Sequence, residues 1–406
     1  MALNKHSYER HQMKNLELLF KQNKIKPYKI NLQKDGIHVQ VTAENNGIFS
    51  GVEIERLIAT ISLLPTTYVK MHLPIHLYIK LDRFIDKLTY VFLENICYYV
   101  ITQNKQAMQV YYSAVSDIST RGIASSPLLL LNNTKLSSVG KYADKFKFDI
   151  YGNHYRRLIK YDVSIENTNY LGDIYQEIDT FLILYGIDEK RRDEVALVVT
   201  ELVGNSGEHG ETDCLVDIDI SRSFRKYDGG KLADDNYYYG INIAVVNFSL
   251  NLLGDGIDQN IIRSQRELPA NEKYEKVKEA YARHKLLFDE EYKYEDFCNI
   301  TAFQTRISGR TENALTGGTG LTKLIRSLEN QSDAYRCYVI SGKRCINFYR
   351  DFLEYTSDGW IGFNKKNNYL EERPETGVVD HCFINMPGTA YNLNFIMKGE
   401  KIKDGK

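Results

Sequence analysis

The sequence has few cysteines, and their spacing builds neither a disulfide framework nor a zinc site. None of the six forms a Cys-x-x-Cys pair, and no cluster of cysteine and histidine has the spacing of zinc ligands. The first residues are polar and of mixed charge, and they lack the pattern of a secretory signal. These absences predict free thiols in a reducing cytoplasm. The cysteines are Cys97, Cys214, Cys298, Cys337, Cys345 and Cys382.

Long apolar runs and an excess of one charge are also missing. The most apolar stretch, residues 88–101, is interrupted by Glu94 and Asn95 and is too short to span a bilayer. The formal net charge is only −1, so no global basic field favours nucleic acid. With 43% hydrophobic residues over 406 positions, the composition predicts a globular protein with sizeable cores and two or three domains.

Residues 188–210 predict one amphipathic helix. Asp188 is a candidate N-cap, and a charged first turn follows it. Gly210 is expected to end the helix as the glycine after the C-cap. Apolar residues recur at helical spacing and predict the buried stripe, which consists of Val195, Val198, Val199 and Leu202.

Three polar side chains, Glu201, Asn205 and His209, follow one side of this helix at four-residue steps. Because each step advances only ~40° beyond a full turn, the three can face a common ligand. A carboxylate can activate a water molecule, and a carboxamide one turn away offers an oxygen ligand to Mg²⁺. For His209 two roles stay open: a hydrogen bond near bound phosphates, or a cation at the helix C-terminus.

Beyond this helix the pattern changes to strands. Residues 215–220 alternate apolar and acidic side chains, and residues 237–246 form an apolar, tyrosine-rich run, so we expect two antiparallel strands joined by a long turn. Residues 316–326 read TGGTGLTKLIR, with glycines directly before a helix, which is the geometry by which backbone N–H groups hold phosphates. Further strands are expected at 338–340, 345–349, 359–363, 381–385 and 391–396.

The N-terminal part alternates strands and helices. Strands are predicted at 28–30, 37–41, 75–79 and 108–112, and helices at 6–22, 52–64 and 84–103. We therefore expect a small α/β domain over residues 1–155, with a regulatory or dimerising role. Its order of elements resembles that of STAS-type modules, without a shared motif. A hairpin across Gly152-Asn153 and a helix at 170–184 are expected next.

Three blocks, in their order along the chain, resemble the GHKL (Bergerat-fold) ATPases, the superfamily of DNA gyrase, histidine kinases and anti-sigma kinases. Residues 201–210, ELVGNSGEHG, resemble the N box, and residues 317–321, GGTGL, are similar to the G2 box. Residues 387–389, Pro-Gly-Thr before a strand, resemble the late Gly-Thr element. The resemblance covers about residues 165–398. It implies an α+β fold, in which a GHKL α/β sandwich with a mixed sheet and helices on one face binds ATP and Mg²⁺.

The resemblance also implies roles for single residues. Glu201 would be the general base that orients a water molecule, and Asn205 would bind Mg²⁺. The glycines of residues 317–321 would hold the triphosphate at a helix start, and Thr389 would lie near adenine. The residues that it assigns to ATP are Asn205, His209, Asn247, Ser249, Gly317, Gly318, Thr319, Gly320, Leu321 and Thr389.

One block departs from the family pattern, which has Asp-x-Gly-x-Gly after a buried strand. In one register Asn247 and Ser249 replace the aspartate and the first glycine. In the other, the glycines of residues 254–256 match and Leu252 stands in the aspartate position. We favour Asn247, because its strand precedes it directly. An asparagine oxygen can still accept a hydrogen bond from the adenine amino group.

The span of about residues 250–316 would be the ATP lid of this family. Arg306 and Arg310 lie near its end, and Lys323 lies in the helix after the glycines. These cations are candidates for contact with the γ-phosphate, and a solvated basic face is the alternative.

The leading hypothesis is a Mg²⁺-dependent ATPase whose hydrolysis drives a conformational switch on a protein partner or a homodimer. One alternative is a nucleotide-binding scaffold with little hydrolysis, because the adenine block is altered. The other is a serine/threonine protein kinase of the anti-sigma type, because His209 and Gly210 close the first block as they do in that group.

Overall fold

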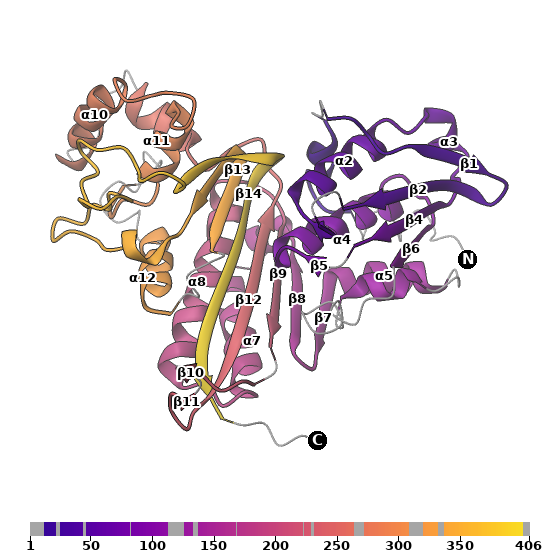
Figure 1. The fold of residues 1–406 in the computed structure, drawn as a ribbon, viewed down its shortest axis with the longest axis horizontal. Coiled ribbons are helices and arrows are strands. Elements are labelled where there is room, and N and C mark those ends of the chain that lie inside the picture. The colour runs from indigo at the N-terminus through magenta and orange to yellow at the C-terminus, as the bar shows by residue number, and fades with distance from the viewer. Residues whose placement is uncertain are drawn as a thin grey trace.

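The computed structural model describes residues 12–21, 25–43, 46–81, 83–112, 126–132, 137–167, 169–221, 223–228, 231–263, 272–307, 320–331 and 337–400. In these ranges the chain is a mixed α and β protein with two main sheets, one in the N-terminal part and one in the rest (Figure 1). None of the helices in the described ranges has the length and apolar character needed to cross a membrane.

The N-terminal sheet has the strand order β1-β2-β4-β6. β1 and β2 form an antiparallel hairpin, and β2, β4 and β6 are parallel neighbours. Helices pack on one side of it, and the two longest begin at capped residues: Ser50 and Glu53 form a capping box before α2, and Asp86 caps α4. The strands are β1 (Ile30–Gln33), β2 (Gly36–Thr42), β4 (Ile75–Lys80) and β6 (Met108–Tyr112), with a small pair β3 (Ile48–Phe49) and β5 (Arg83–Phe84). The helices are η1 (Leu16–Phe20), α2 (Gly51–Ser62), α3 (Thr66–Lys70), α4 (Lys87–Thr102), η3 (Pro127–Asn132) and α5 (Ser137–Lys147).

The predicted helices at 52–64 and 84–103 and the strands at 75–79 and 108–112 are confirmed. In the described part of 6–22 the expected helix is instead the single short turn η1, because Asn15 adopts a left-handed conformation with φ 63° directly before it.

The second sheet has the strand order β13-β14-β12-β9-β8-β7. Every pair of neighbouring strands in it is antiparallel. The sheet that mixes parallel and antiparallel pairs is instead the N-terminal one. β7 and β8 are the predicted hairpin, and the sheet therefore begins at Phe148, before the expected start at 165. The strands are β7 (Phe148–Tyr151), β8 (His154–Ile159), β9 (Cys214–Ile220), β12 (Tyr237–Asn247), β13 (Tyr338–Asn347) and β14 (Val379–Gly399), with a small hairpin β10 (Tyr227–Asp228) and β11 (Lys231–Leu232).

Several expected short strands differ in the structure. The segments 338–340 and 345–349 belong largely to the single strand β13, and 381–385 and 391–396 are parts of the long strand β14. The expected strand at 359–363 is wrong. There the Ile361 N–H donates to Gln304 Oε1 at 2.8 Å, and Gln304 Nε2 donates back to the Ile361 carbonyl at 3.0 Å. A side chain thus satisfies the backbone groups that a neighbouring strand would otherwise pair.

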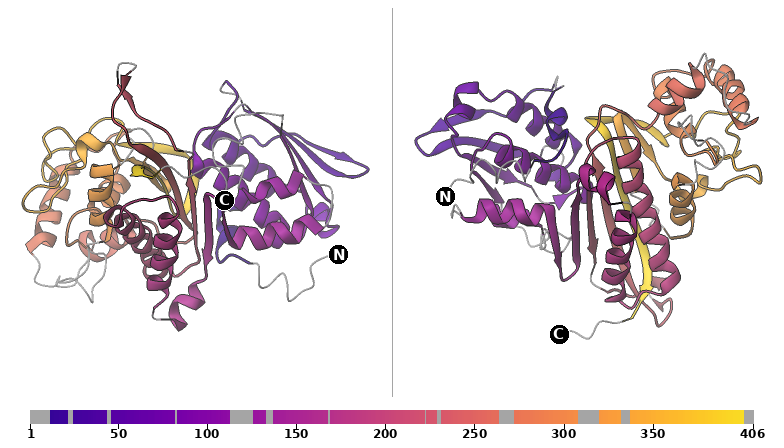
Figure 2. Two further views of the ribbon diagram at one scale, coloured as in Figure 1. Left: turned by 90° about the horizontal axis from the view of Figure 1, so that it is seen from below. Right: turned by 180° about the vertical axis from the view of Figure 1, so that it is seen from behind.

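Three helices, α7, α8 and α12, cover one face of the second sheet (Figure 2). Alternate strand residues such as Val216, Ile218 and Ile243 point into the core beneath these helices. The Asp188 side chain accepts a hydrogen bond from the Arg191 N–H at 3.2 Å, which confirms the predicted N-cap of α8. The helices and the short helix before them are α6 (Tyr161–Glu166), α7 (Tyr170–Ile183), α8 (Glu189–Glu208) and α12 (Gly320–Gln331).

The end of α8 has the predicted position, but its backbone conformation differs from that of a glycine stop. Gly210 follows the C-cap His209, but the left-handed residue is Glu211, with φ 48°. The Gly210 N–H still donates to the Ser206 carbonyl at 3.1 Å, so the helix ends without a left-handed glycine.

The other face of the second sheet is covered by the N-terminal part of the chain. Leu215, Val246 and Ala390 point to this side and share one buried cluster with α2 and α4. Helices therefore lie on both faces of the sheet rather than on one, and the strands are buried on both sides.

The segment expected to be the lid has a packed core of its own in its described residues. His284 Nδ1 of α10 forms a hydrogen bond with the Tyr292 hydroxyl at 2.6 Å, and its Nε2 forms one with the Tyr369 carbonyl at 2.8 Å. The ring of Trp360 stacks on that of Tyr369. Arg344 of β13 pairs with the buried Asp296 of α11 through two hydrogen bonds. The loop between β13 and β14 thus packs with this segment. Its elements are α9 (Asp255–Ile257), η4 (Asp258–Ile262), α10 (Glu272–His284) and α11 (Tyr294–Thr301), together with η5 (Arg350–Phe352) of the loop.

A buried network of charged side chains joins α4 to the second sheet. Lys87 pairs with Asp217 and Asp219, and Glu94 pairs with Arg156, which also pairs with Asp217. All five side chains are at most 3% exposed. Because an unpaired buried charge is very unfavourable, each of these groups holds its partners in place.

These charges shift the pKa values of their neighbours. Although burial acts the other way, Arg156 and Lys87 hold the pKa of Asp217 well below its usual range. Burial also opposes the charge on His154, but Asp217 at 3.1 Å and Asp149 at 3.5 Å raise the pKa of this histidine to about 9. His154 is therefore a further cation of the network at neutral pH.

We predict that Arg156→Leu lowers the free energy of unfolding by about 3–5 kcal/mol, because Glu94 and Asp217 lose the cation that compensates their burial. The matched control is Arg157→Leu. Arg157 is the next residue of β8, but its pair with Glu177 is partly exposed, so we expect a loss of about 0–1 kcal/mol. Urea denaturation measures both values, and equal losses would contradict the role given to the network.

Candidate functional site

Three segments that are distant in sequence meet at the buried side chain of Asn247, at the end of β12. Its Nδ2 donates to Ser206 Oγ of α8 at 2.8 Å and to Thr389 Oγ1 of β14 at 2.7 Å. Its Oδ1 accepts from the Thr389 N–H at 3.3 Å. The structure therefore brings together the last turn of the predicted helix, the strand end and the late Pro-Gly-Thr segment.

Gly388 lets these segments approach closely. It has φ +92°, and a Cβ at this position would lie 2.6 Å from the Asn247 carbonyl oxygen and 2.7 Å from the Ser249 nitrogen. The Ser249 N–H donates to the Pro387 carbonyl at 3.3 Å, and its hydroxyl donates to the Gly210 carbonyl at 3.0 Å. Only glycine fits here without moving the backbone around Asn247.

The two registers of the altered block have different surroundings. Asn247 and Ser249 contact α8 and the segment 387–389, as described above. Gly254 instead starts α9 against α11, where a Cβ would lie 2.7 Å from that of Cys298. The Leu252 N–H donates to the Asp255 carboxylate at 2.7 Å, so the 254–256 turn is closed by its own side chain. The register with Asn247 is therefore the one whose residues contact Thr389.

The exposed side of α8 faces the beginning of α12. Lys323, in the first turn of α12, donates to Glu201 Oε1 at 2.5 Å, and both side chains are partly exposed. Asn205 follows one turn later on α8 and is half-buried. Leu321 packs against the helical core of the sheet. The start of the helix after the glycines thus lies beside Glu201, although more than a hundred residues separate them in sequence.

His209 lies at the C-terminal end of α8 and at the surface. Its carbonyl accepts a hydrogen bond from Asn251 Nδ2 at 2.9 Å, which ties the helix end to the segment after Asn247. Partial desolvation lowers the pKa of His209. This direction favours the uncharged ring and disfavours the role of a cation at the helix end.

Some of the remaining predicted residues lie outside the part of the chain that the structure describes, and the others lie at the start of α12 or after α11. Gly317, Gly318, Thr319 and Arg310 lie outside the described residues, and Gly320 is the first residue of α12. Arg306 lies near Lys273, whose pKa is lowered first by desolvation and then by the charge of Arg306. The loop around Gly359 is adjacent, because the Thr305 N–H donates to the Gly359 carbonyl at 3.2 Å.

Two serines of this site were not predicted from the sequence. Ser206 accepts from Asn247, and Ser341 of β13 donates to the Gly388 carbonyl at 2.8 Å and accepts from the Leu253 N–H at 2.9 Å. A signal for Ser206 exists, since it follows Asn205 and faces the opposite, buried side of the helix. For Ser341 the sequence carries no comparable signal, because its role depends on the pairing of β13 with β14.

Ligands for a metal ion can be assessed from the donor atoms. In the described part of the chain, groups of three or more acidic or histidine side chains occur at Asp35, His38 and His76, and at His154, Asp217 and Asp219, but not around Asn205. The second group is already compensated by Lys87 and Arg156. A Mg²⁺ ion at Asn205 would need phosphate oxygens and water for its remaining ligands, as Mg²⁺ in nucleotide sites commonly has.

Comparisons with known proteins give no family for this chain. No family model, no curated protein and no solved structure matches it.

We predict that Gly388→Ala lowers the free energy of unfolding by at least about 1 kcal/mol, because the new Cβ would collide with Asn247 and Ser249 at a positive φ. Gly140→Ala in α5 is the matched control. No atom of the described residues lies within 4 Å of its added Cβ, so this change should leave stability unchanged or raise it slightly. Thermal or urea unfolding distinguishes the two, and an unchanged stability of Gly388→Ala would refute the close approach.

Proposed function

We propose that this protein is a Mg²⁺-dependent ATP-binding protein of the GHKL type, and that it hydrolyses ATP to switch the conformation of a dimer or a partner. The observation that carries the proposal is the meeting of Asn247, Ser206 and Thr389, with the start of α12 beside Glu201. In the GHKL pattern these same segments form the adenine end and the phosphate end of one site.

The hydrogen bonds of Asn247 support adenine as the base. Ser206 and Thr389 accept both of its amide hydrogens, and Oδ1 already accepts one hydrogen bond from the Thr389 N–H. The second lone pair of Oδ1 can therefore accept a hydrogen bond from a base. Thr389 Oγ1 accepts from Asn247, and no described residue accepts its hydroxyl hydrogen. An acceptor next to a donor complements the amino group and N1 of adenine, whereas guanine presents the opposite pattern.

The phosphate end would be formed by Glu201, Asn205 and Lys323. In the structure the Glu201 carboxylate is bound to Lys323 at 2.5 Å and is not poised to take a proton. When a γ-phosphate is present, Lys323 would donate to it instead. The released carboxylate would then polarise a water molecule for attack on the phosphorus, while Asn205 would contribute an oxygen to the Mg²⁺ that neutralises the phosphates.

A second candidate function is nucleotide binding with little hydrolysis. The Glu201–Lys323 pair favours it, because a lysine that stays on the carboxylate keeps the base inactive. Transfer of the phosphate to a serine or threonine of a partner protein is the third outcome. All three predict ATP binding and differ in where the γ-phosphate goes.

We predict that Glu201→Gln lowers the rate of ATP turnover at least ~100-fold while ATP binding is retained, because general-base catalysis contributes factors of this size. Glu189→Gln is the matched control, since it lies in the first turn of the same helix, twelve residues away, and should keep the rate. Release of labelled phosphate measures turnover. When cell proteins are added to the same reaction, label that stays on a protein reveals transfer to a partner. A Glu201→Gln rate equal to that of the wild type would remove Glu201 from the mechanism.

A further inference from the structure

The outer face of the N-terminal sheet carries two histidines side by side. His38 of β2 and His76 of β4 are direct partners in the parallel register, so their side chains leave the sheet on the same face. Their rings are stacked with centroids 4.6 Å apart, and each residue is only 8% exposed.

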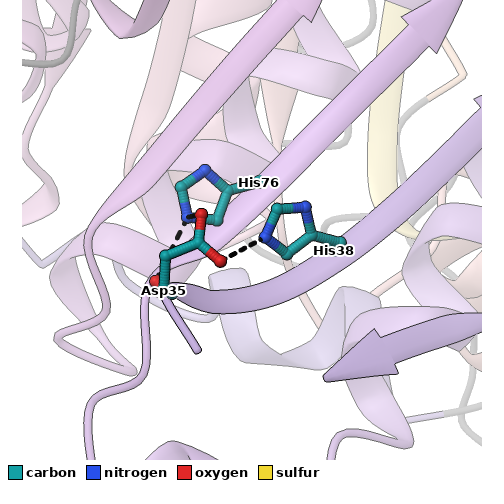
Figure 3. Close-up of side chains that lie close together, drawn as sticks. All are labelled: Asp35, His38 and His76. Atoms are coloured by element: carbon teal, nitrogen blue, oxygen red, sulfur yellow. Dashed lines mark hydrogen bonds and ion pairs between the residues drawn. The ribbon is translucent and has the colours of Figure 1, made fainter. Parts of the chain in front are cut away.

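A tight turn brings a carboxylate to this pair (Figure 3). Asp35 lies in the turn between β1 and β2, and Gly36 follows it with φ +146°. A Cβ at position 36 would lie 2.4 Å from the Pro74 carbonyl oxygen, which accepts a hydrogen bond from the Ile37 N–H at 2.8 Å. Glycine therefore allows the turn to rest against the segment before His76, and this contact fixes the place of Asp35.

Both imidazoles direct Nε2 toward this one residue. His38 Nε2 lies 2.9 Å from Asp35 Oδ1, and His76 Nε2 lies 3.9 Å from Asp35 Oδ2 (Figure 3). The ligand atoms of the three residues all lie within 4.8 Å of one another. Donors around a tetrahedral zinc ion are about 3.3 Å apart, given bonds of about 2.0–2.1 Å. Because the Asp35 side chain is 63% exposed in a turn, it can close this difference and leave room for water ligands.

The polar groups of His76 are poorly satisfied by the protein. Its Nδ1 is buried and has no hydrogen-bond partner in the described part of the chain, and its Nε2 makes a long contact of 3.3 Å with the Asp35 carbonyl. Buried polar atoms in proteins are usually paired. An ion bound at Nε2 would replace the long contact of that atom, whereas Nδ1 is not a ligand atom of the proposed site.

We propose that Asp35, His38 and His76 form a binding site for a divalent transition-metal ion of the zinc type, completed by solvent. Imidazole with one carboxylate favours zinc and its neighbours over Mg²⁺, which prefers oxygen ligands. The ion would clamp the β1–β2 turn onto β4. This site is independent of the proposed nucleotide site, because its ligands come only from the N-terminal sheet.

The test is a titration of the metal-free, full-length protein with Zn²⁺ in competition with a chromophoric chelator. It is done in excess Mg²⁺ and without nucleotide, so that neither the outcome nor its failure depends on ATP binding. We expect one Zn²⁺ per chain with micromolar or tighter affinity. Asp35→Asn and His38→Gln should each weaken binding at least tenfold, and circular dichroism verifies that the variants fold.

The matched control is His381→Gln, an exposed histidine of β14 outside the cluster, which should bind Zn²⁺ as the wild type does. Because Asp35 is exposed in a turn, Asp35→Asn keeps the test valid even where a histidine variant does not fold. Unchanged stoichiometry and affinity in Asp35→Asn, or no Zn²⁺ bound by the wild type at 100 μM chelator-buffered metal (a concentration about a hundredfold above a micromolar Kd), would overturn the proposal.

Discussion

The burial of charges between α4 and strands β8 and β9 is the constraint on which the rest of the structure depends. Lys87 and Arg156 compensate Asp217 and Asp219, whose side chains are buried. Such a network adds little net stability over an apolar core, but it tolerates few alternative arrangements, because each displaced partner leaves a buried charge. The N-terminal part is therefore joined to the second sheet in one orientation, and the sheet is enclosed on both faces.

The candidate site depends on this enclosed sheet through strand register. Asn247 and Thr389 are direct partners in the pairing of β12 with β14, and Asn247 is also paired with Cys214 at the start of β9. A slip of one residue would turn Asn247 to the opposite face and separate it from Ser206. The position of the amide is thus set by the whole sheet rather than by the local sequence, and the N-terminal part contributes by holding one face of that sheet.

The local sequence pattern predicted the helices and strands better than it predicted which residues pack against them. The limits of α8, β9 and β12 follow from periodicity and from the Asp188 cap, because these signals act over a few residues. The alternation of apolar and acidic residues at 215–220 is typical of a strand with one face in water. Here the acidic face is buried, because its cations come from Lys87 and Arg156, which are distant in sequence. The packing of residues 353–378 with the expected lid is long-range in the same way and carries no local signal.

The central claim is that Asn247, Thr389 and the side of α8 that carries Glu201 and Asn205 form a site for ATP and Mg²⁺. Calorimetric titration with a non-hydrolysable ATP analogue, in the presence and absence of Mg²⁺ and against the matching GTP analogue, tests it most directly. The account predicts micromolar or tighter binding of the ATP analogue, strengthened by Mg²⁺, and binding of the GTP analogue at least tenfold weaker, which corresponds to about 1.4 kcal/mol. Absence of heat with the ATP analogue, or equal affinity for both nucleotides, would contradict it.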